Sequence, residues 1–189
     1  MQASRLIASE LNALNREMHA VAEGMKSDDW LRRGFAAANL PAFTFWHIVR
    51  VIDSTVNMGL RGSAELIASE PWASKAWTRP DIGTGYSSEE ADALAAQVVP
   101  SEVLAYADAV RSHVSQWLRS IPDEELETPA RLLDRMRDLP AYNQPAVLEA
   151  TIPFDGQPAW MVLTFACFAH GWAHLEEIRL LVQAVRAAY

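Results

Sequence analysis

Two histidines one helical turn apart are the residues of this sequence best suited to chemistry. His170 and His174 lie within residues 165–178, and positions four apart on an α-helix point to the same side. Two neutral imidazoles on one face can bind a divalent metal ion and leave room for a third ligand from another helix. His47, within residues 45–50, is the candidate for that third ligand.

Each of these residues also has an ordinary structural interpretation. Histidine pairs occur on solvated helix faces, and a single His47 beside Trp46 is typical of a core histidine whose ring is satisfied. On a helical wheel, Cys167 and Glu177 share the side of His170, although Cys167 is also typical of a small core residue. Such a polar line on an inward face is unfavourable without a partner, and a metal ion would be one.

Four long helices are predicted to position these residues. Apolar side chains recur at three- and four-residue steps, and Pro41 and Pro158 fit first turns. The helices are expected at residues 4–25, 41–60, 102–120 and 158–188. The pattern therefore predicts an all-α protein built as a four-helix bundle.

The connections between these helices are predicted to be long and irregular. Residues 62–100 carry several Pro and Gly, with a capping box at residues 87–90 that predicts a short helix to Ala95. Residues 131–137 favour a helix, whereas residues 146–152 fit either a strand or a helix. We expect the 62–100 connection, with its tryptophans, to form a wall of any pocket.

Composition limits the class of protein. A length of 189 residues predicts one domain spanning 1–189. A net charge of −8 without a basic cluster argues against a nucleic-acid partner. The single Cys167 excludes an internal disulfide and is typical of a reducing compartment. The longest largely apolar stretch, residues 159–169, is shorter than the roughly 20 residues that a membrane span needs. We therefore predict a cytoplasmic protein without a membrane partner.

Other familiar catalytic patterns are absent from the sequence. No glycine-rich phosphate-binding motif occurs, and Gly171 follows His170 where the metalloprotease motif His-Glu-x-x-His has Glu. The Glu-x-x-His pairs of ferritin-like di-iron bundles are missing as well. The histidine pair therefore carries the chemical interpretation.

Three segments, in this order, resemble motifs of the DinB-like (YfiT-like) family. Residues 45–53, Phe-Trp-His-Ile-Val-Arg-Val-Ile-Asp, are similar to its Trp-His-x-x-Arg-x-x-Asp stretch, and residues 83–90 to a Gly-Thr-Gly-x-Ser segment. Residues 170–178, His-Gly-Trp-Ala-His-Leu-Glu-Glu-Ile, are similar to its closing His-x-x-x-His-x-Gly-Gln/Glu-Ile motif. Glu177 stands at the Gln/Glu position, and Glu176 replaces a common Gly.

This resemblance implies a fold and a ligand set. The bundle would run up-down-down-up, and His47, His170 and His174 would bind a divalent metal ion, Zn or Ni. Relatives are often dimers, so a homodimer is expected. The resemblance covers nearly the whole chain.

The resemblance also favours a function. Characterised relatives include transferases that depend on low-molecular-weight thiols, so we expect a thiol-dependent transferase acting on a small molecule. One alternative is a hydrolase that uses metal-activated water. Another is a non-catalytic helical dimer module with a vestigial metal site, so catalysis itself stays open.

Two further residues receive roles in the catalytic interpretation. Glu177 is predicted to orient a ligand or to carry a proton, and Arg50 to hold an anionic group of the substrate. The alternative for Arg50 is a surface or interhelical ion pair with Asp53, three residues along the chain.

Overall fold

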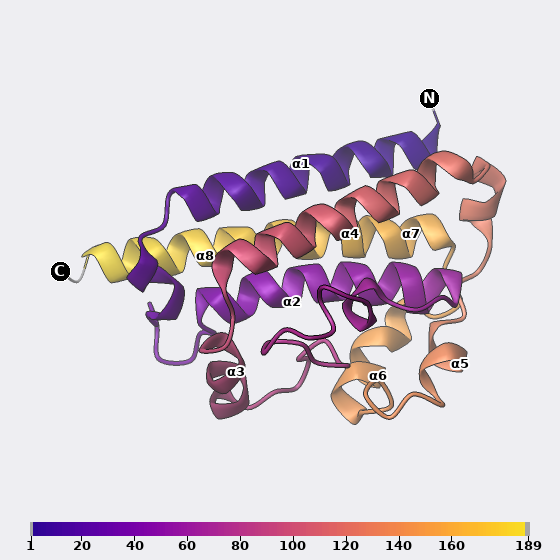
Figure 1. Cartoon of the computed structure of the whole chain (residues 1–189). Helices are drawn as coiled ribbons and strands as arrows, with labels where there is room; N and C mark the ends of the chain where they lie inside the picture. The colour runs from indigo at the N-terminus through magenta and orange to yellow at the C-terminus, as the bar shows by residue number, and fades with distance from the viewer. Residues whose placement is uncertain (1, 188–189) are drawn as a thin grey trace.

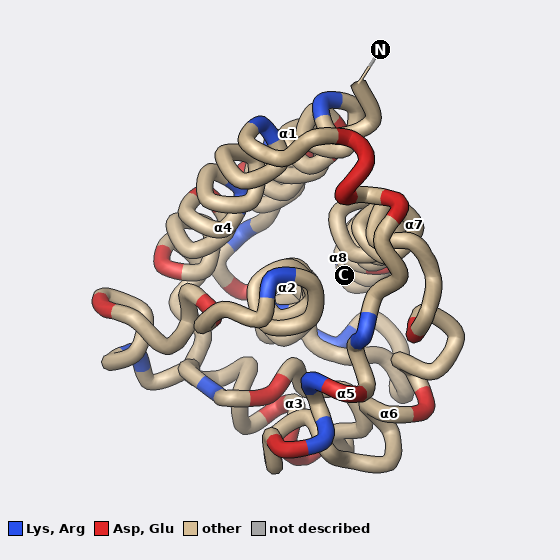
Figure 2. Tube along the Cα trace, turned by 90° about the vertical axis from the view of Figure 1, so that its right-hand side faces the viewer, with Lys and Arg blue, Asp and Glu red and all other residues tan. Residues whose placement is uncertain are grey.

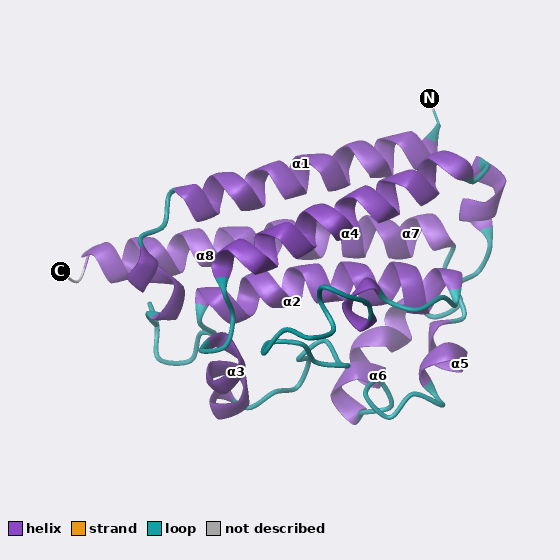
Figure 3. Cartoon of the chain, viewed as in Figure 1, coloured by secondary structure: helices purple, strands orange, loops and turns teal. Residues whose placement is uncertain are grey.

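The computed structural model describes residues 2–187, and helices make up its regular structure (Figure 3). Within that range the only β-type pairing is an isolated bridge between Pro129 and Pro158. The α-helices are α1 (Ala3–Glu23), α2 (Pro41–Asp53), α3 (Ser88–Ala95), α4 (Pro100–Ser120), α5 (Leu132–Met136), α6 (Pro145–Thr151), α7 (Ala159–Thr164) and α8 (His170–Ala187).

Four long rods form the bundle. They are α1, α2, α4 and the rod in which α7 and α8 are joined by a π-helical segment, Phe165–Ala169. A second π-helical segment, Ser54–Arg61, continues α2. In Figure 1, α1 and the α7–α8 rod run in one direction, whereas α2 and α4 run in the other. This is the up-down-down-up order that the family resemblance implies.

The short helices form a second layer beneath α2. Figure 2, which looks along the bundle, shows α1 and α4 on one side, α2 near the centre, and α3, α5 and α6 below it. Lys and Arg positions are scattered over several elements in this view. Because this layer covers α2, both the bundle and the connections can contact its side chains.

The predicted helix ends agree closely with the structure. Pro41 and Pro100 stand in the first turns of α2 and α4, where a missing N–H costs nothing. Ser87 caps α3 by accepting from the Glu90 amide, and Glu90 accepts in return from the Ser87 amide. Residues 146–152, ambiguous in the sequence, belong mainly to α6. The last residue of the predicted final helix, Ala188, lies outside the described residues.

The core lies between the four rods. Its fully buried members include Leu14 of α1, Trp46 of α2, Val114 of α4 and Leu175 of α8. No helix within residues 2–187 is long and apolar enough to span a membrane. The all-α bundle thus places one face of α2 against α8, and the histidines stand on these two helices.

Candidate metal centre

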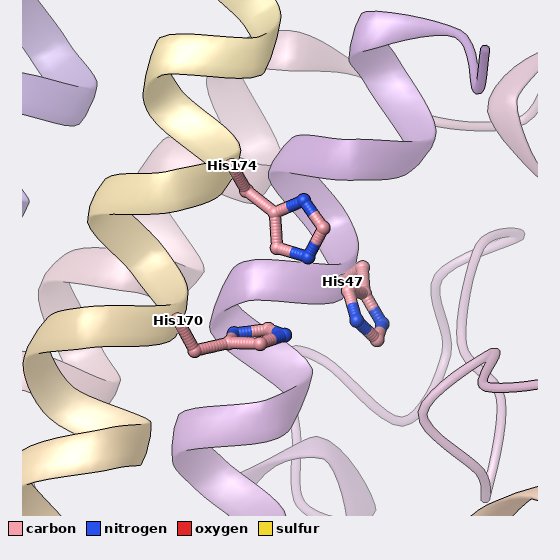
Figure 4. Close-up of side chains that lie close together, drawn as sticks. All are labelled: His47, His170 and His174. Carbon is pink, nitrogen blue, oxygen red and sulfur yellow. The ribbon is translucent and has the colours of Figure 1, made fainter. Parts of the chain in front are cut away.

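The three histidines singled out from the sequence lie together between α2 and α8 (Figure 4). One nitrogen from each ring of His47, His170 and His174 lies within 4.8 Å of the other two. The ring centroids are 5.0 Å apart for His47 and His170, 5.3 Å for His47 and His174, and 4.5 Å for the α8 pair. This half-buried group could hold a metal ion.

His47 is held by the backbone of a distant loop. Its Nδ1 lies 2.5 Å from the carbonyl oxygen of Ile82. Because a carbonyl oxygen only accepts hydrogen bonds, Nδ1 carries the proton and Nε2 keeps a free lone pair. Phe43, one turn earlier on α2, stacks against the ring with 5.9 Å between centroids and 7° between planes. The protein therefore sets both the tautomer and the orientation of His47.

His174 is held by its own helix. Its Nδ1 lies 2.7 Å from Oε2 of Glu177, three residues further along α8. An ionised carboxylate only accepts, so Nε2 of His174 is again the nitrogen with a free lone pair. Metal-binding histidines commonly donate their other ring N–H to a carboxylate or to a backbone carbonyl. His174 and His47 show these two arrangements.

His170 has no such anchor. Its Nδ1 is buried without a hydrogen-bond partner, and the ring packs against Phe165 with 5.4 Å between centroids. A buried polar nitrogen without a partner costs free energy, so this ring is the least satisfied of the three. Two fixed Nε2 lone pairs beside an incompletely satisfied imidazole form a donor set that suits a first-row divalent ion.

Burial keeps the imidazoles of His47 and His170 neutral. It lowers the pKa of His47 to about 4, although the hydrogen bond to Ile82 opposes the shift. Burial also lowers the pKa of His170 to about 3, and the neighbouring His47 and His174 contribute to the lowering. Only a neutral imidazole can donate a lone pair to a metal ion, so both rings are ready to bind one at neutral pH.

Cys167 lies in the core, although a regular helical wheel places it beside His170. The side chain has no exposure and belongs to the main hydrophobic cluster. The π-helical segment Phe165–Ala169 takes more residues per turn than an α-helix, so it changes the phase between Cys167 and His170. Burial raises the pKa of the Cys167 thiol to about 12. This residue therefore stays a protonated thiol within the core.

Arg50 is an interior residue: the predicted ion pair with Asp53 is present, but it lies buried within one helix and is neither a surface nor an interhelical pair. Both side chains have no exposure, lie on the same helix and are 3.3 Å apart. All five N–H groups of the guanidinium are bonded within the protein, to Asp53, Glu65, Tyr106, Tyr142 and the carbonyl of Asp81. No N–H group of Arg50 is left to hold an anionic group of the substrate, the role predicted for it from the sequence.

Of the tryptophans in the 62–100 connection, Trp77 belongs to the core and Trp72 packs against it partly buried. Trp77 has no exposure and donates its indole N–H to Glu102, and Trp72 and Trp77 both pack against Tyr106. The part of the connection that reaches the histidines is the loop around Ile82. Sequence reasoning missed Ile82 because its contribution is a backbone carbonyl, which no side-chain pattern reveals.

Comparison with known proteins agrees with this fold. The sequence model of the DinB superfamily matches residues 10–178. A crystal structure of a conserved protein from Enterococcus faecalis superposes with a TM-score of 0.68 at 17% identity, covering 99% of each chain. That likeness shows the fold alone, and a search of curated proteins found no match. The family match extends over most of the sequence and includes all three histidines, so the chain belongs to the DinB superfamily.

Proposed function

We propose that this protein is a metal-dependent enzyme in which His47, His170 and His174 bind one divalent ion, and in which a small thiol is the nucleophile of a group transfer. The observation that carries the metal-dependent part is the convergence of three ring nitrogens within 4.8 Å. The thiol-dependent part rests on the family, whose characterised members include thiol-dependent transferases. When bound, a divalent ion such as Zn²⁺ or Ni²⁺ favours the thiolate form of a thiol at its open position.

The protein's own groups have defined tasks in this proposal. Ile82 and Glu177 hold the Nδ1 protons of His47 and His174, which directs both Nε2 lone pairs to one ion. The second carboxylate oxygen of Glu177 has no partner among the described residues, and its side chain is 35% exposed. Glu177 can therefore also accept the proton that a thiol loses on becoming a thiolate.

Metal content is the first test. Elemental analysis of untagged protein is expected to find about one equivalent of Zn or Ni, lost in His47→Ala and His174→Ala. His19→Ala is the matched control, because His19 lies on α1 against Asp108, 3.2 Å away, outside the centre. Absence of metal in the wild type, even after incubation with Zn²⁺, would overturn the proposal.

Turnover then decides the reaction. The metal-loaded protein should transfer a group from an electrophilic small molecule only when a low-molecular-weight thiol is present. Hydrolysis of esters or amides without a thiol would instead establish a hydrolase. Bound metal without either activity would favour a non-catalytic module, for which the expected homodimer, measured by light scattering, would be the functional form.

A further inference from the structure

Arg50 and the loop that holds His47 are joined by a continuous set of hydrogen bonds. Arg50 Nε donates to the carbonyl oxygen of Asp81 across 3.1 Å. The next residue, Ile82, accepts from His47 Nδ1 through its own carbonyl. Arg50 and His47 are three residues apart on α2 and thus project from neighbouring positions on one side of the helix. The same helix therefore supplies a candidate ligand and the group that holds the ligand's acceptor.

The side chain of Asp81 fixes the loop from the other direction. Its Oδ1 accepts from the amide of Gly83 at 2.8 Å, and its Oδ2 accepts from the hydroxyl of Tyr86 at 3.0 Å. The Asp81 carbonyl, before Ile82, and the Gly83 amide, after it, are therefore both hydrogen-bonded. The peptide that presents the Ile82 carbonyl to His47 has little freedom to turn away.

Arg50 is itself held firmly enough to serve as an anchor. Glu65 and Asp53 accept from its guanidinium at 2.7 and 3.3 Å, and Tyr106 and Tyr142 accept at 3.2 and 3.0 Å. The guanidinium has no exposure, and Glu65 is bonded in addition by the Tyr142 hydroxyl at 2.7 Å. Such a fully satisfied buried network favours one arrangement of its members.

We propose that Arg50 and Asp81 are positioning residues, which hold the Ile82 carbonyl so that His47 carries its proton on Nδ1 and presents Nε2 to the metal. Neither residue contacts the metal or the substrate in this role. The inference rests on the proposed metal centre for its purpose. The hydrogen bonds themselves belong to the fold and do not depend on that purpose. Loss of such an outer partner typically weakens metal binding by about 10- to 100-fold.

The test compares three variants. Arg50→Lys keeps the charge but cannot reach Asp81 together with the two carboxylates. Asp81→Ala removes the contacts to Gly83 and Tyr86 while leaving the buried ion pairs intact, so it tests the same loop if Arg50→Lys fails to fold. Arg135→Lys is the matched control, because Arg135 also donates to backbone carbonyls, those of Met58 and Gly59, away from the loop.

The decisive readout is the tautomer of His47 in metal-free protein. Nitrogen NMR of the imidazole, above the ordinary histidine pKa, should show the proton on Nδ1 in the wild type and in Arg135→Lys. Either loop variant should show a mixture of tautomers and should bind Co²⁺ at least about 10-fold more weakly. A wild-type tautomer population in folded Arg50→Lys and Asp81→Ala would overturn the inference. Failure of the wild type to bind metal would instead overturn the proposed function, and the tautomer result would still decide the positioning role.

Discussion

On α2, His47 is anchored to a loop carbonyl 35 residues away along the chain, whereas on α8, His174 is anchored to Glu177, three residues along the same helix. The first anchor is built into a buried network of charges. The second is a single hydrogen bond to a carboxylate that is about one third exposed. The α2 half of the centre therefore depends on the tertiary fold, and the α8 half depends on local helix geometry.

The two anchors predict different effects of substitution on stability and on metal binding. A change in the network around Arg50 disturbs the packing of the 62–100 connection on α2, so stability and metal binding should fall together. A change at Glu177 leaves the core untouched, so metal binding should fall alone. Substitutions for which both the free energy of unfolding and the metal affinity are measured can test this distinction.

Asp53→Ala should produce the largest effect. Asp53 has no exposure and accepts from Arg50, from the Tyr106 hydroxyl and from the amides of Leu66 and Ile67. Removing Asp53 leaves Arg50 with Glu65 as its remaining carboxylate and leaves two backbone amides without their acceptor, at a cost of about 3–5 kcal/mol. Urea unfolding measures this loss. Asp134→Ala, at an exposed residue near Arg137, is the control and should change stability by less than about 0.5 kcal/mol.

Acidification should destabilise the metal-free protein through both halves. The folded-state pKa values of His47 and His170, about 4 and about 3, lie below the 6.5 of an unperturbed histidine. Between these values the unfolded chain binds more protons, so the free energy of unfolding falls as pH drops from 6.5 toward 4 and 3.

Unfolding curves across this pH range check that expectation. His47→Asn and His170→Asn should each remove part of the pH dependence, because each ring is buried. Equal slopes in the wild type and in both variants would show that the imidazoles are hydrated, and the two halves would then differ in anchoring alone.

Gly83→Ala should disturb the α2 half by an intermediate amount. A Cβ at Gly83 would meet Phe43 and Trp46 ring atoms at 2.9 Å, and φ is +74°. Gly156 is a close control, because its φ is +77° but a Cβ there would meet nothing within 4 Å. The left-handed backbone costs about 1–2 kcal/mol in both variants. The clash should add about 1–3 kcal/mol in Gly83→Ala alone, measured by urea unfolding. Equal losses in the two variants would show that the loop yields easily.

The bundle followed from the sequence because its helices are long and strongly periodic. The stripe through Leu11, Leu14 and Met18 is buried as the spacing requires. The angular position of Cys167 relative to His170 did not follow from the sequence. A periodicity of 3.6 residues assumes an unbroken α-helix, whereas Phe165–Ala169 is π-helical. Cys167 was placed beside His170 for that reason.

The hydrogen-bond partners of the metal centre likewise divide into those set by local helix spacing and those set by distant segments. The spacing of His170 and His174 on one helix is a local property, and so is the placement of Glu177 beside His174. The anchor of His47 depends on where a distant loop lies. The acceptor is the backbone carbonyl of Ile82, a group that every residue carries and that the sequence therefore does not single out. The spacing of Arg50 and Asp53 predicts a surface or interhelical pair because it does not reveal the other partners of Arg50, Glu65 and Tyr142, which come from other parts of the chain.

Glu177→Gln should produce the smallest change in stability and the clearest separation of the two halves. The Gln side chain keeps an oxygen that can accept from His174 Nδ1 but loses the charge, so metal affinity should fall by about 10-fold. Stability should stay within about 0.5 kcal/mol, because a single contact at a side chain about one third exposed contributes little. Glu176→Gln makes the same charge change one residue earlier, at a side chain paired with Arg179.

Co²⁺ titration of both variants separates the effect of the Glu177–His174 hydrogen bond from the effect of negative charge on the helix surface. Equal weakening by Glu176→Gln would mean that the helix surface attracts the ion and that Glu177 does not orient His174. Weakening by Glu177→Gln alone would show that a local anchor can set affinity without contributing to the fold.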